Sequence, residues 1–260
     1  MNRVLFAAEE LAEPLPVADS RALHMLRILK VGVGSTIEMG VIGGTVGTAT
    51  VSAVSDRAIW LDFSLSGDPG PPLLPITCLL GHPRPIVLKR ILRDLSAVGV
   101  AQIIVCATEL GERSYLKSRL WHGDSRWRYL IEGAEQAGAT TLPQVHIAPS
   151  VTHGLQRLDE LQDDASATQL FFDEAAKPGP GVDLSFPARI ESPLVYAVGS
   201  ERGWTERERT LFHRRSWRTV GLGPRVLRVE TAAVAAAVMC ASALANNPGV
   251  SPSDQRRSNG

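Results

Sequence analysis

Hydrophobic and polar positions follow two different patterns along the chain, and the change falls near residue 70. Up to residue 66, short apolar alternations such as "STIEMG", "GTATVSAV" and "RAIWLDFSL" are separated by glycine-rich stretches. Alternation with a period of two places every second side chain on the same face of a strand. This part of the chain therefore predicts a small β-barrel or sandwich.

One helical segment, "ADSRALHMLRILKVG", interrupts these strands. Asp19 or Ser20 can cap its first turn, and Gly32 is expected to end it. Its apolar positions are Leu23, Leu26 and Ile28. Basic or titratable side chains recur every third residue along one side, namely His24, Arg27 and Lys30. This side is either a solvated face or a contact with nucleic acid.

A linker separates the two patterns. The stretch "SGDPGPPLLP" holds six prolines and glycines between residues 67 and 75, a composition typical of a connection between domains. We therefore expect two domains, at residues 1–68 and 73–246. The last residues, 247–260, are rich in Ser, Pro, Asn and Gly and are predicted to be a disordered tail.

After the linker, apolar runs alternate with segments of helical periodicity. Strands are predicted at residues 76–80 and in "QIIVCA", "PQVHIA", "TQLFFDE", "PLVYAVGS" and "WRTVGL". Helices are predicted in "RPIVLKRILRDLSAVG", "RWRYLIEGAEQAG", "THGLQRLDELQ", "TERERTLFHRR" and the alanine-rich run after Glu230. Such alternation favours an α/β fold with a parallel sheet that helices cover on both faces.

Composition is that of a globular protein, with 260 residues of which 44% are hydrophobic and 21% charged. Cys78, Cys106 and Cys240 lie far apart, which predicts neither a disulfide framework nor a zinc site and favours a reducing cytoplasm. The alanine-rich run has about 15 residues, fewer than the roughly 20 that span a bilayer, and the first residues do not resemble a secretory signal. We expect no membrane association, and no metal, since the histidines lack metal-ligand spacing.

Charge is balanced overall but uneven along the chain. Residues 71–150 hold nine Lys and Arg against six Asp and Glu, and residues 199–245 hold eight against four. Residues 1–70 hold only five basic against eight acidic side chains. A neutral protein can still present a local basic face to phosphates, so this sequence is compatible with a nucleic-acid partner.

Two loops combine glycines with charged residues at the ends of predicted strands. "AVGSERGWTERE" turns through Gly199 and Gly203 and enters a helix with a capping box, while "GLGPRVLRVETA" turns through Gly221 and Gly223. Glycine lets a backbone approach a ligand closely, and ligands of parallel sheets bind where the strands end. One such loop alone is typical of a tight turn, but two together indicate a ligand site.

The charged residues of these loops suggest the chemistry of that ligand. Glu201 and Glu230 can bind hydroxyl groups or cap helices, whereas Arg225 and Arg228 can neutralise a phosphate or a developing anion. The usual glycine signatures of dinucleotide and P-loop sites are missing, and Ser200 lacks the flanking glycines of a nucleophile elbow. A hydrolase or an ordinary nucleotide-binding enzyme is therefore disfavoured.

Together, "YAVGSERGWTERE" and "GLGPRVLRVETAA" resemble the paired C-terminal motifs of the bacterial 16S ribosomal RNA uridine N3-methyltransferases, in the SPOUT class of knotted methyltransferases. "HMLRILKVGVGSTIEMG" is similar to the family's N-terminal PUA-like barrel, and "RPIVLKRILRDLSAVGVAQI" and "RWRYLIEGAEQAGATTLPQVH" are similar to parts of its methyltransferase domain. The resemblance covers the chain from about Met1 to Leu244.

The resemblance implies a PUA-like RNA-binding barrel at residues 1–68 and a trefoil-knotted SPOUT α/β domain at residues 73–246. It also implies S-adenosylmethionine as cofactor, a homodimer, and 16S rRNA or the small ribosomal subunit as partner. The alanines of the last helix, Ala232, Ala233, Ala236 and Ala237, would suit close packing in the knot or dimer. Ordinary packing of that helix against the sheet is the alternative.

Roles carry over by position. The residues implied to contact or shape the cofactor pocket are Gly199, Glu201, Gly203, Leu222, Gly223, Val226 and Leu227. The implied catalytic residues are Arg228, Arg225 and Glu230. RNA contacts are expected from His24, Arg27 and Lys30 and from Lys89, Arg90 and Arg93.

This chain departs from the family pattern in both loops. Ser200 and Arg202 stand where many members have proline and glycine, and Val229 stands where threonine is usual. The expected function is methylation of a uridine at N3 in 16S rRNA. The alternatives are a non-catalytic RNA-binding protein on the same scaffold and a methyltransferase for another RNA position.

Overall fold

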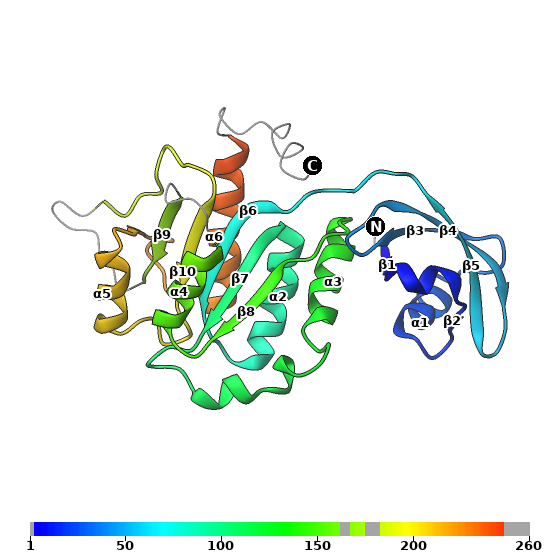
Figure 1. Ribbon diagram of the computed structural model, residues 1–260, viewed down its shortest axis with the longest axis horizontal. Coiled ribbons are helices and arrows are strands. Elements are labelled where there is room, and N and C mark those ends of the chain that lie inside the picture. The colour runs from blue at the N-terminus through cyan, green and yellow to red at the C-terminus, as the bar shows by residue number, and fades with distance from the viewer. Residues whose placement is uncertain (1–2, 162–166, 175–182, 247–260) are drawn as a thin grey trace. The chain divides into compact units, whose positions relative to one another are not determined.

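The computed structural model describes residues 3–161, 167–174 and 183–246 (Figure 1). The predicted tail at 247–260 lies outside these ranges. Contacts divide the described chain into two compact units. The first holds residues up to Leu73 together with Leu130–Leu142, and the second holds the rest. The sequence pattern predicts residues 130–142 as part of the second domain, whereas in the structure they pack with the first unit.

The first unit is built on a five-stranded sheet in the order β1-β3-β4-β5-β2. Its elements are β1 (Val4–Phe6), the short 3-10 helix η1 (Ala8–Ala12), β2 (Leu15–Pro16), α1 (Ser20–Arg27), β3 (Thr36–Val41), β4 (Val46–Val54) and β5 (Ala58–Leu65). β1 runs parallel to β3, and the other neighbours are antiparallel. Apolar side chains of the strands and of α1 form one core.

The helix in this unit differs in detail from its prediction. Asp19 is the N-cap, as expected, and its carboxylate accepts a hydrogen bond from the Arg21 amide at 2.8 Å. The helix ends at Arg27 and not at Gly32. Its buried residues are Ala22 and Met25, whereas Ile28 is 68% exposed. The expected apolar face was therefore wrong at Ile28, because the helix ends before this position can face the core.

Three charged side chains join η1 to α1 in the first unit. The Arg21 guanidinium contacts Glu10 at 2.6 Å and Asp19 at 2.8 Å, and it lies over the Phe6 ring at 5.0 Å. The hydrogen bond from Arg21 holds the pKa of the Glu10 carboxyl below its usual value, although partial burial opposes this. For Asp19, burial would raise the pKa, but the hydrogen bonds from Arg21 outweigh it and lower the pKa.

The second unit is the predicted α/β fold. Its sheet has six strands in the order β11-β9-β10-β6-β7-β8, and every neighbouring pair is parallel. The strands are β6 (Leu74–Gly81), β7 (Val100–Cys106), β8 (Gln144–Ala148), β9 (Thr168–Phe172), β10 (Leu194–Val198) and β11 (Arg218–Val220). The helices that follow these strands along the chain are α2 (Pro85–Val98), α3 (Trp127–Ala137), α4 (Val151–Leu161), α5 (Glu206–Arg214) and α6 (Val229–Ala245). Of α3, the residues from Leu130 onward belong to the first unit.

Helices cover both faces of this sheet, and the alternation along β10 explains why (Figure 1). Val195 and Ala197 point toward α4 and α5, where they join a core with Phe212. Tyr196 points the opposite way, and its hydroxyl donates a hydrogen bond to the Ala233 carbonyl of α6 at 3.2 Å. A strand buried on both faces must be apolar throughout, which is the pattern of "PLVYAV".

Candidate active site

A cavity of about 900 Å³ opens at the carboxyl edge of the parallel sheet. Its wall contains residues at the ends of three neighbouring strands: Phe172 of β9, Val198 of β10, and Gly221, which directly follows β11. Arg84 and Val87 at the start of α2 complete this part of the wall. The carboxyl ends of parallel strands are where loops can converge on a ligand. The cavity therefore lies where the sequence predicts a ligand site.

The first glycine loop bends so tightly that a larger residue at Gly199 would collide with it. A Cβ atom there would lie 3.0 Å from the Gly203 Cα and 3.2 Å from the Trp204 Nε1. Gly203 has a φ of +66°, and its amide donates to the Ser200 carbonyl at 2.9 Å. The two glycines thus let the loop turn back against its own backbone at the cavity wall.

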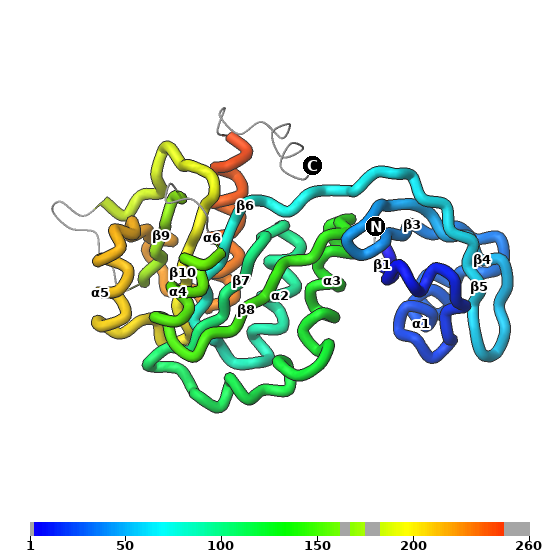
Figure 2. Tube along the Cα trace, viewed as in Figure 1, coloured from blue at the N-terminus to red at the C-terminus, as the bar shows by residue number. Residues whose placement is uncertain are grey.

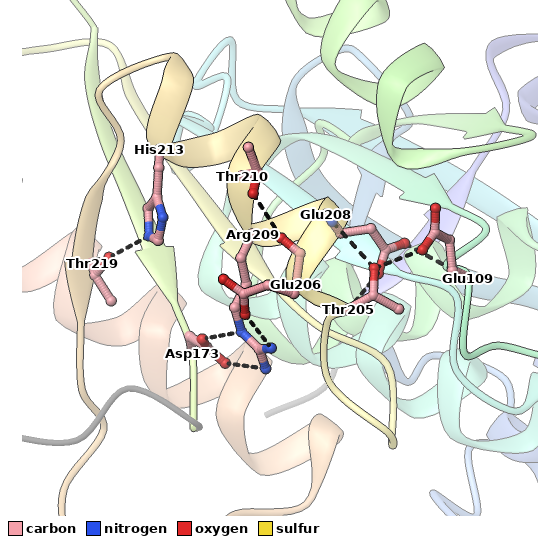
Figure 3. Close-up of polar contacts among 9 residues, drawn as sticks. All are labelled: Glu109, Asp173, Thr205, Glu206, Glu208, Arg209, Thr210, His213 and Thr219. Atoms are coloured by element: carbon pink, nitrogen blue, oxygen red, sulfur yellow. Dashed lines mark hydrogen bonds and ion pairs between the residues drawn. The ribbon is translucent and has the colours of Figure 1, made fainter.

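The capping box predicted at the start of α5 is present, and it also holds a second loop. The Glu208 side chain is 3% exposed. Its two carboxylate oxygens accept hydrogen bonds from the Thr205 amide at 2.9 Å and from the Glu109 amide at 2.8 Å. Figure 3 shows this cluster, in which the Thr205 hydroxyl also reaches the Glu109 carboxylate at 2.7 Å. The loops that follow β7 and β10 are therefore tied together by one buried carboxylate.

An ion pair supports the cavity behind this loop. Asp173, which follows β9 and lines the cavity, is 7% exposed and contacts the Arg209 Nε at 2.7 Å (Figure 3). The hydrogen bond to Asp173 is the main cause of the raised pKa of Arg209. Because Arg209 is already paired with Asp173, its guanidinium is not available to a ligand.

The second glycine loop presents two arginines that are not engaged in this way. Gly223 has a φ of +99°, a backbone conformation that favours glycine, and the Gly221 amide donates to the Leu184 carbonyl at 2.9 Å. Arg225 and Arg228 line the cavity, are exposed, and form no ion pair with any other described residue. Arg228 is also the N-cap residue of α6, without a side-chain capping bond. Two cationic groups are thus available to a ligand.

The acidic residues of the two loops differ in their partners. The Glu201 carboxylate accepts a hydrogen bond from the Arg84 amide at 2.8 Å, which ties the first loop to the start of α2. Glu230 lies in the first turn of α6, is half-buried, and has no hydrogen bond or ion pair within the described ranges. Glu201 therefore has a structural contact, whereas Glu230 is free to interact with a ligand.

All of the residues predicted for catalysis or cofactor binding line this one cavity. They are Gly199, Glu201, Gly203, Leu222, Gly223, Arg225, Val226, Leu227, Arg228 and Glu230. Sequence reasoning missed Arg84, Phe172, Asp173 and Trp204, which also line it. The position of "FFDE" at the end of a predicted parallel strand could have indicated Phe172 and Asp173.

The residues predicted to contact RNA are distributed over both units. In the first unit, Arg27 and Lys30 are exposed, and His24 is half-buried. Lys30 has a φ of +53°, so it stands outside the helix and does not continue the stripe. Lys89, Arg90 and Arg93 all lie on α2 of the second unit. Lys89 contacts the Tyr129 ring at 5.5 Å, and Arg93 pairs with the adjacent Asp94 at 3.0 Å.

Two of the three residues that depart from the family pattern, Ser200 and Arg202, have clear structural partners. The Ser200 hydroxyl is buried and lies 3.1 Å from the Thr108 hydroxyl, so it joins the cavity loop to the loop after β7. Arg202 points to the Leu110 carbonyl at 3.5 Å. Val229 is buried in the first turn of α6.

Other candidate chemistry is limited among the described residues. The three cysteines are free and buried, and burial raises the pKa of the Cys78 thiol to about 12, so it stays protonated. No group of three or more His, Cys, Asp or Glu side chains in the described ranges is arranged to hold a metal ion. The helices in these ranges also lack the length and hydrophobicity that crossing a membrane requires.

Comparison with known proteins identifies the class. Residues 70–241 match the RNA methyltransferase domain family. The Ribosomal RNA small subunit methyltransferase E of Treponema pallidum is 41% identical over 249 residues, which cover 95% of this chain and 91% of that protein. The chain therefore belongs to the RNA methyltransferase family, and within it to the small subunit methyltransferase E group.

Solved structures agree on the fold. A Ribosomal RNA small subunit methyltransferase E from Neisseria gonorrhoeae, bound to S-adenosyl methionine, superposes with a TM-score of 0.64 at 22% identity and covers 93% of this chain and 97% of its own. The Legionella pneumophila methyltransferase Lpg2936, in complex with the same cofactor, superposes with a TM-score of 0.70 at 18% identity and covers 94% of this chain and 98% of its own.

Proposed function

We propose that this protein is an S-adenosylmethionine-dependent methyltransferase that methylates N3 of one uridine in the 16S rRNA of the small ribosomal subunit. The observation that carries the proposal is the convergence of both glycine loops on one cavity with two free arginines, in a chain 41% identical to a small subunit rRNA methyltransferase. The cytoplasm, where ribosomal RNA is made, is the proposed location.

The cavity wall fits the cofactor. The Trp204 indole Nε1 is buried and has no acceptor among the described residues, so a ligand atom in the cavity could satisfy it. Backbone groups around Gly199, Gly203 and Gly223 can approach a ligand closely, and Leu222, Val226 and Leu227 supply apolar surface. We propose that these residues, with Glu201, hold S-adenosylmethionine. When bound, this cofactor supplies a methyl group that its positively charged sulfonium activates.

The arginines would act on the uracil ring. N3 of uridine carries a proton and becomes a strong nucleophile only when that proton leaves, which places negative charge on the ring and its two carbonyl oxygens. Arg225 and Arg228 can donate hydrogen bonds to these oxygens and so stabilise the anion. Stabilising charge that develops only during the reaction speeds the chemical step.

A carboxylate is proposed to receive the N3 proton. Glu230 is the better placed of the two acidic residues, because its carboxylate has no partner within the described chain, whereas Glu201 accepts a hydrogen bond from the Arg84 amide. Carboxylates as a class are weak bases compared with a deprotonated uracil ring. The contribution of Glu230 is therefore expected to be smaller than that of the arginines.

The remaining features of the proposal concern RNA and assembly. We propose that residues 1–68 form a PUA-like RNA-binding barrel with contacts from His24, Arg27 and Lys30, and that Lys89, Arg90 and Arg93 of α2 add further contacts. A uridine in folded RNA would have to be splayed out of its stack to enter the cavity.

We further propose that residues 73–246 form a trefoil-knotted domain that acts as a homodimer. Support for the knot comes from the chain path: after the edge strand β11, α6 returns to pack on β10 and β6 in the middle of the sheet. Support for the dimer comes from the outer surface of α6, where Val238 is 50% exposed beside Val234 and Met239. A Val238→Asp variant should sediment as a monomer, and a native mass unchanged from that of the wild type would contradict this interface.

The decisive test is mass spectrometry of 16S rRNA nucleosides. Unmethylated small subunits from cells that lack the gene are incubated with protein and S-adenosylmethionine. One new N3-methyluridine per subunit is the expected product. Methylation at another position would support the second candidate substrate, and RNA binding without cofactor binding would instead support a non-catalytic RNA-binding protein.

A further inference from the structure

The segment that joins β7 to α3 has an unusual composition. Residues 112–128 hold five Lys and Arg against two Asp and Glu, a net charge of +3, in a protein whose total charge is zero. Aromatic residues are interleaved with these cations, as in "ERSYLKSRLWHGDSRWR". Cations mixed with aromatic rings are typical of surfaces that bind single-stranded or irregular RNA. Figure 2 shows the segment as the long connection between β7 and α3.

The middle of this segment is fixed to the residue that follows the strand beside the cavity. The short 3-10 helices η2 (Arg113–Lys117) and η3 (Arg119–Trp121) lie within it. The Trp121 indole N–H donates a hydrogen bond to the buried His82 Nε2 at 3.0 Å, and the other ring nitrogen of His82 donates to the Pro83 carbonyl at 2.7 Å. His82 directly follows β6, and Arg84, two residues later, lines the cavity.

The residues just before this segment, 108–110, are fixed to the first cavity loop. The Thr108 and Ser200 hydroxyls lie 3.1 Å apart, and the Glu109 amide donates to the buried Glu208 carboxylate at 2.8 Å. The Arg202 guanidinium reaches the Leu110 carbonyl at 3.5 Å. Because Trp121 and the residues just before the segment contact elements that form the cavity wall, the segment lies alongside the proposed active site.

The cations in the middle of this segment point to solvent without partners. Arg113, Lys117 and Arg119 are exposed, and none of them forms an ion pair with another described residue. Two of the three aromatic side chains take the opposite role, since Tyr115 and Trp121 pack on the His82 ring at centroid distances of 5.7 and 5.5 Å, whereas Trp127 is exposed. The segment is thus anchored by its rings and presents its charges outward.

We propose that residues 112–128 form an RNA-binding strap, in which Arg113, Lys117 and Arg119 bind phosphates of the RNA on either side of the target nucleotide. This inference rests on the proposed function, since it names the surface that delivers RNA to that cavity. Exposed guanidinium and ammonium groups suit phosphates through charge-assisted hydrogen bonds. Lys89 of α2 lies over the ring of Tyr129, the residue just beyond the segment, at 5.5 Å from its centroid.

The test compares two variants that lose the same charge. The strap variant carries Arg113→Gln, Lys117→Gln and Arg119→Gln. The control carries Arg157→Gln, Arg189→Gln and Arg214→Gln, three arginines of the same unit outside the strap. Arg189 and Arg214 are exposed, and Arg157 is half-buried and pairs with Glu160 at 2.8 Å. Binding to a 16S rRNA transcript is measured over a series of salt concentrations, and binding of S-adenosylhomocysteine is measured by calorimetry.

The strap variant should bind the transcript at least about tenfold more weakly near 0.1 M salt, and its log–log salt slope should be shallower by about 2 to 2.7 for three lost phosphate contacts. The control and the wild type should behave alike, and S-adenosylhomocysteine affinity should stay unchanged in all three. In methyl-transfer assays, the strap variant should show a raised KM for RNA with little change in kcat. Equal weakening by both variants, or no weakening by the strap variant, would overturn the proposal.

A third variant separates the anchor from the charges. Trp121→Phe removes the hydrogen bond to His82 but keeps every cation. It should weaken RNA binding while leaving the salt slope at the wild-type value, because the same phosphate contacts form on a looser segment. Wild-type RNA affinity in this variant would contradict the anchoring role.

The strap proposal and the proposed function can fail separately. If the wild type methylates no RNA, the proposed function is contradicted, but the comparison of RNA binding between the strap variant and its control still tests the strap.

Discussion

Arg209 and Arg215, in and just after α5, and the two arginines of the second cavity loop occur close together in the sequence but have opposite surroundings. Arg209 contacts the buried Asp173 at 2.7 Å, and Arg215, just after α5, makes two contacts with Asp159 at 2.7 and 2.9 Å. Arg225 and Arg228 have no such partner among the described residues and face the cavity. The paired group holds elements of the fold together, whereas the unpaired group is available to a ligand.

This contrast explains why only some of the arginines in the second unit are available to bind RNA. A guanidinium that already has a carboxylate partner gains little from a phosphate, because the existing ion pair must first be broken. When an unpaired guanidinium at a cavity wall binds a phosphate, it gives up only its hydrogen bonds with water. Substitutions in the two groups should therefore separate activity from stability.

The largest effect is expected for an unpaired arginine. Arg228→Ala should lower the rate of methyl transfer at least about 100-fold, the usual cost of losing one donor to a developing anion. Its midpoint of thermal unfolding should match that of the wild type. A single-turnover assay with excess enzyme measures the rate, and wild-type turnover would remove Arg228 from the catalytic group.

The next largest effect is expected for the paired Arg209. Arg209→Ala takes the ion pair from the buried Asp173 and should cost about 3 kcal/mol of unfolding free energy. This corresponds to a fall of roughly 6–12 °C in the melting temperature of a unit of this size. Arg214→Ala is the matched control on the same helix, since Arg214 is exposed and has no ion pair within the described ranges. Equal melting temperatures for the two variants would show that Asp173 does not need this partner.

A smaller effect is expected in acid from the paired Arg21 of the first unit. The folded-state pKa values of Glu10 and Asp19 lie below their ordinary values of 4.5 and 3.8. Carboxyl groups whose pKa is lowered by folding stabilise the fold at pH values above their ordinary pKa. This contribution is lost as the pH falls from the ordinary pKa through the lower folded-state pKa. Denaturant unfolding at pH 7 and at steps below pH 4.5 measures the loss. Arg21→Gln should flatten this dependence, and an unaltered pH profile would contradict the assignment.

The smallest effect is expected for Arg215. Its ion pair with Asp159 has good geometry but lies at the surface, so Arg215→Ala should cost less than about 1 kcal/mol and less still at high salt. Chemical denaturation at low and high ionic strength measures this difference. A loss as large as that of Arg209→Ala would mean that exposure does not distinguish the two pairs.

Local sequence determined much of this protein. The alternating runs predicted the parallel sheet and its helices, because strand and helix periods differ. The capping box at Thr205 and Glu208 was predicted from its spacing alone, since both residues lie within one turn. The two glycine loops predicted the cavity wall, because strand ends in a parallel sheet meet at one edge.

Other features depended on residues distant in the chain. The packing of residues 130–142 with the first unit and the early end of α1, which leaves Ile28 exposed, are tertiary outcomes that no local pattern encodes. The same holds for Arg84 at the cavity and for the anchoring of residues 112–128 by His82.

The sequence by itself thus determined the elements and the loops of the site, because these depend on periodicity, capping and glycine. The tertiary structure alone decided which charges are free. Arg209 and Arg228 are the same residue type in the same basic stretch. Their roles differ because only Arg209 contacts a buried carboxylate, that of Asp173 after β9. An ion pair between residues 36 positions apart leaves no local pattern in the sequence, so free and paired arginines become distinct only in the folded chain.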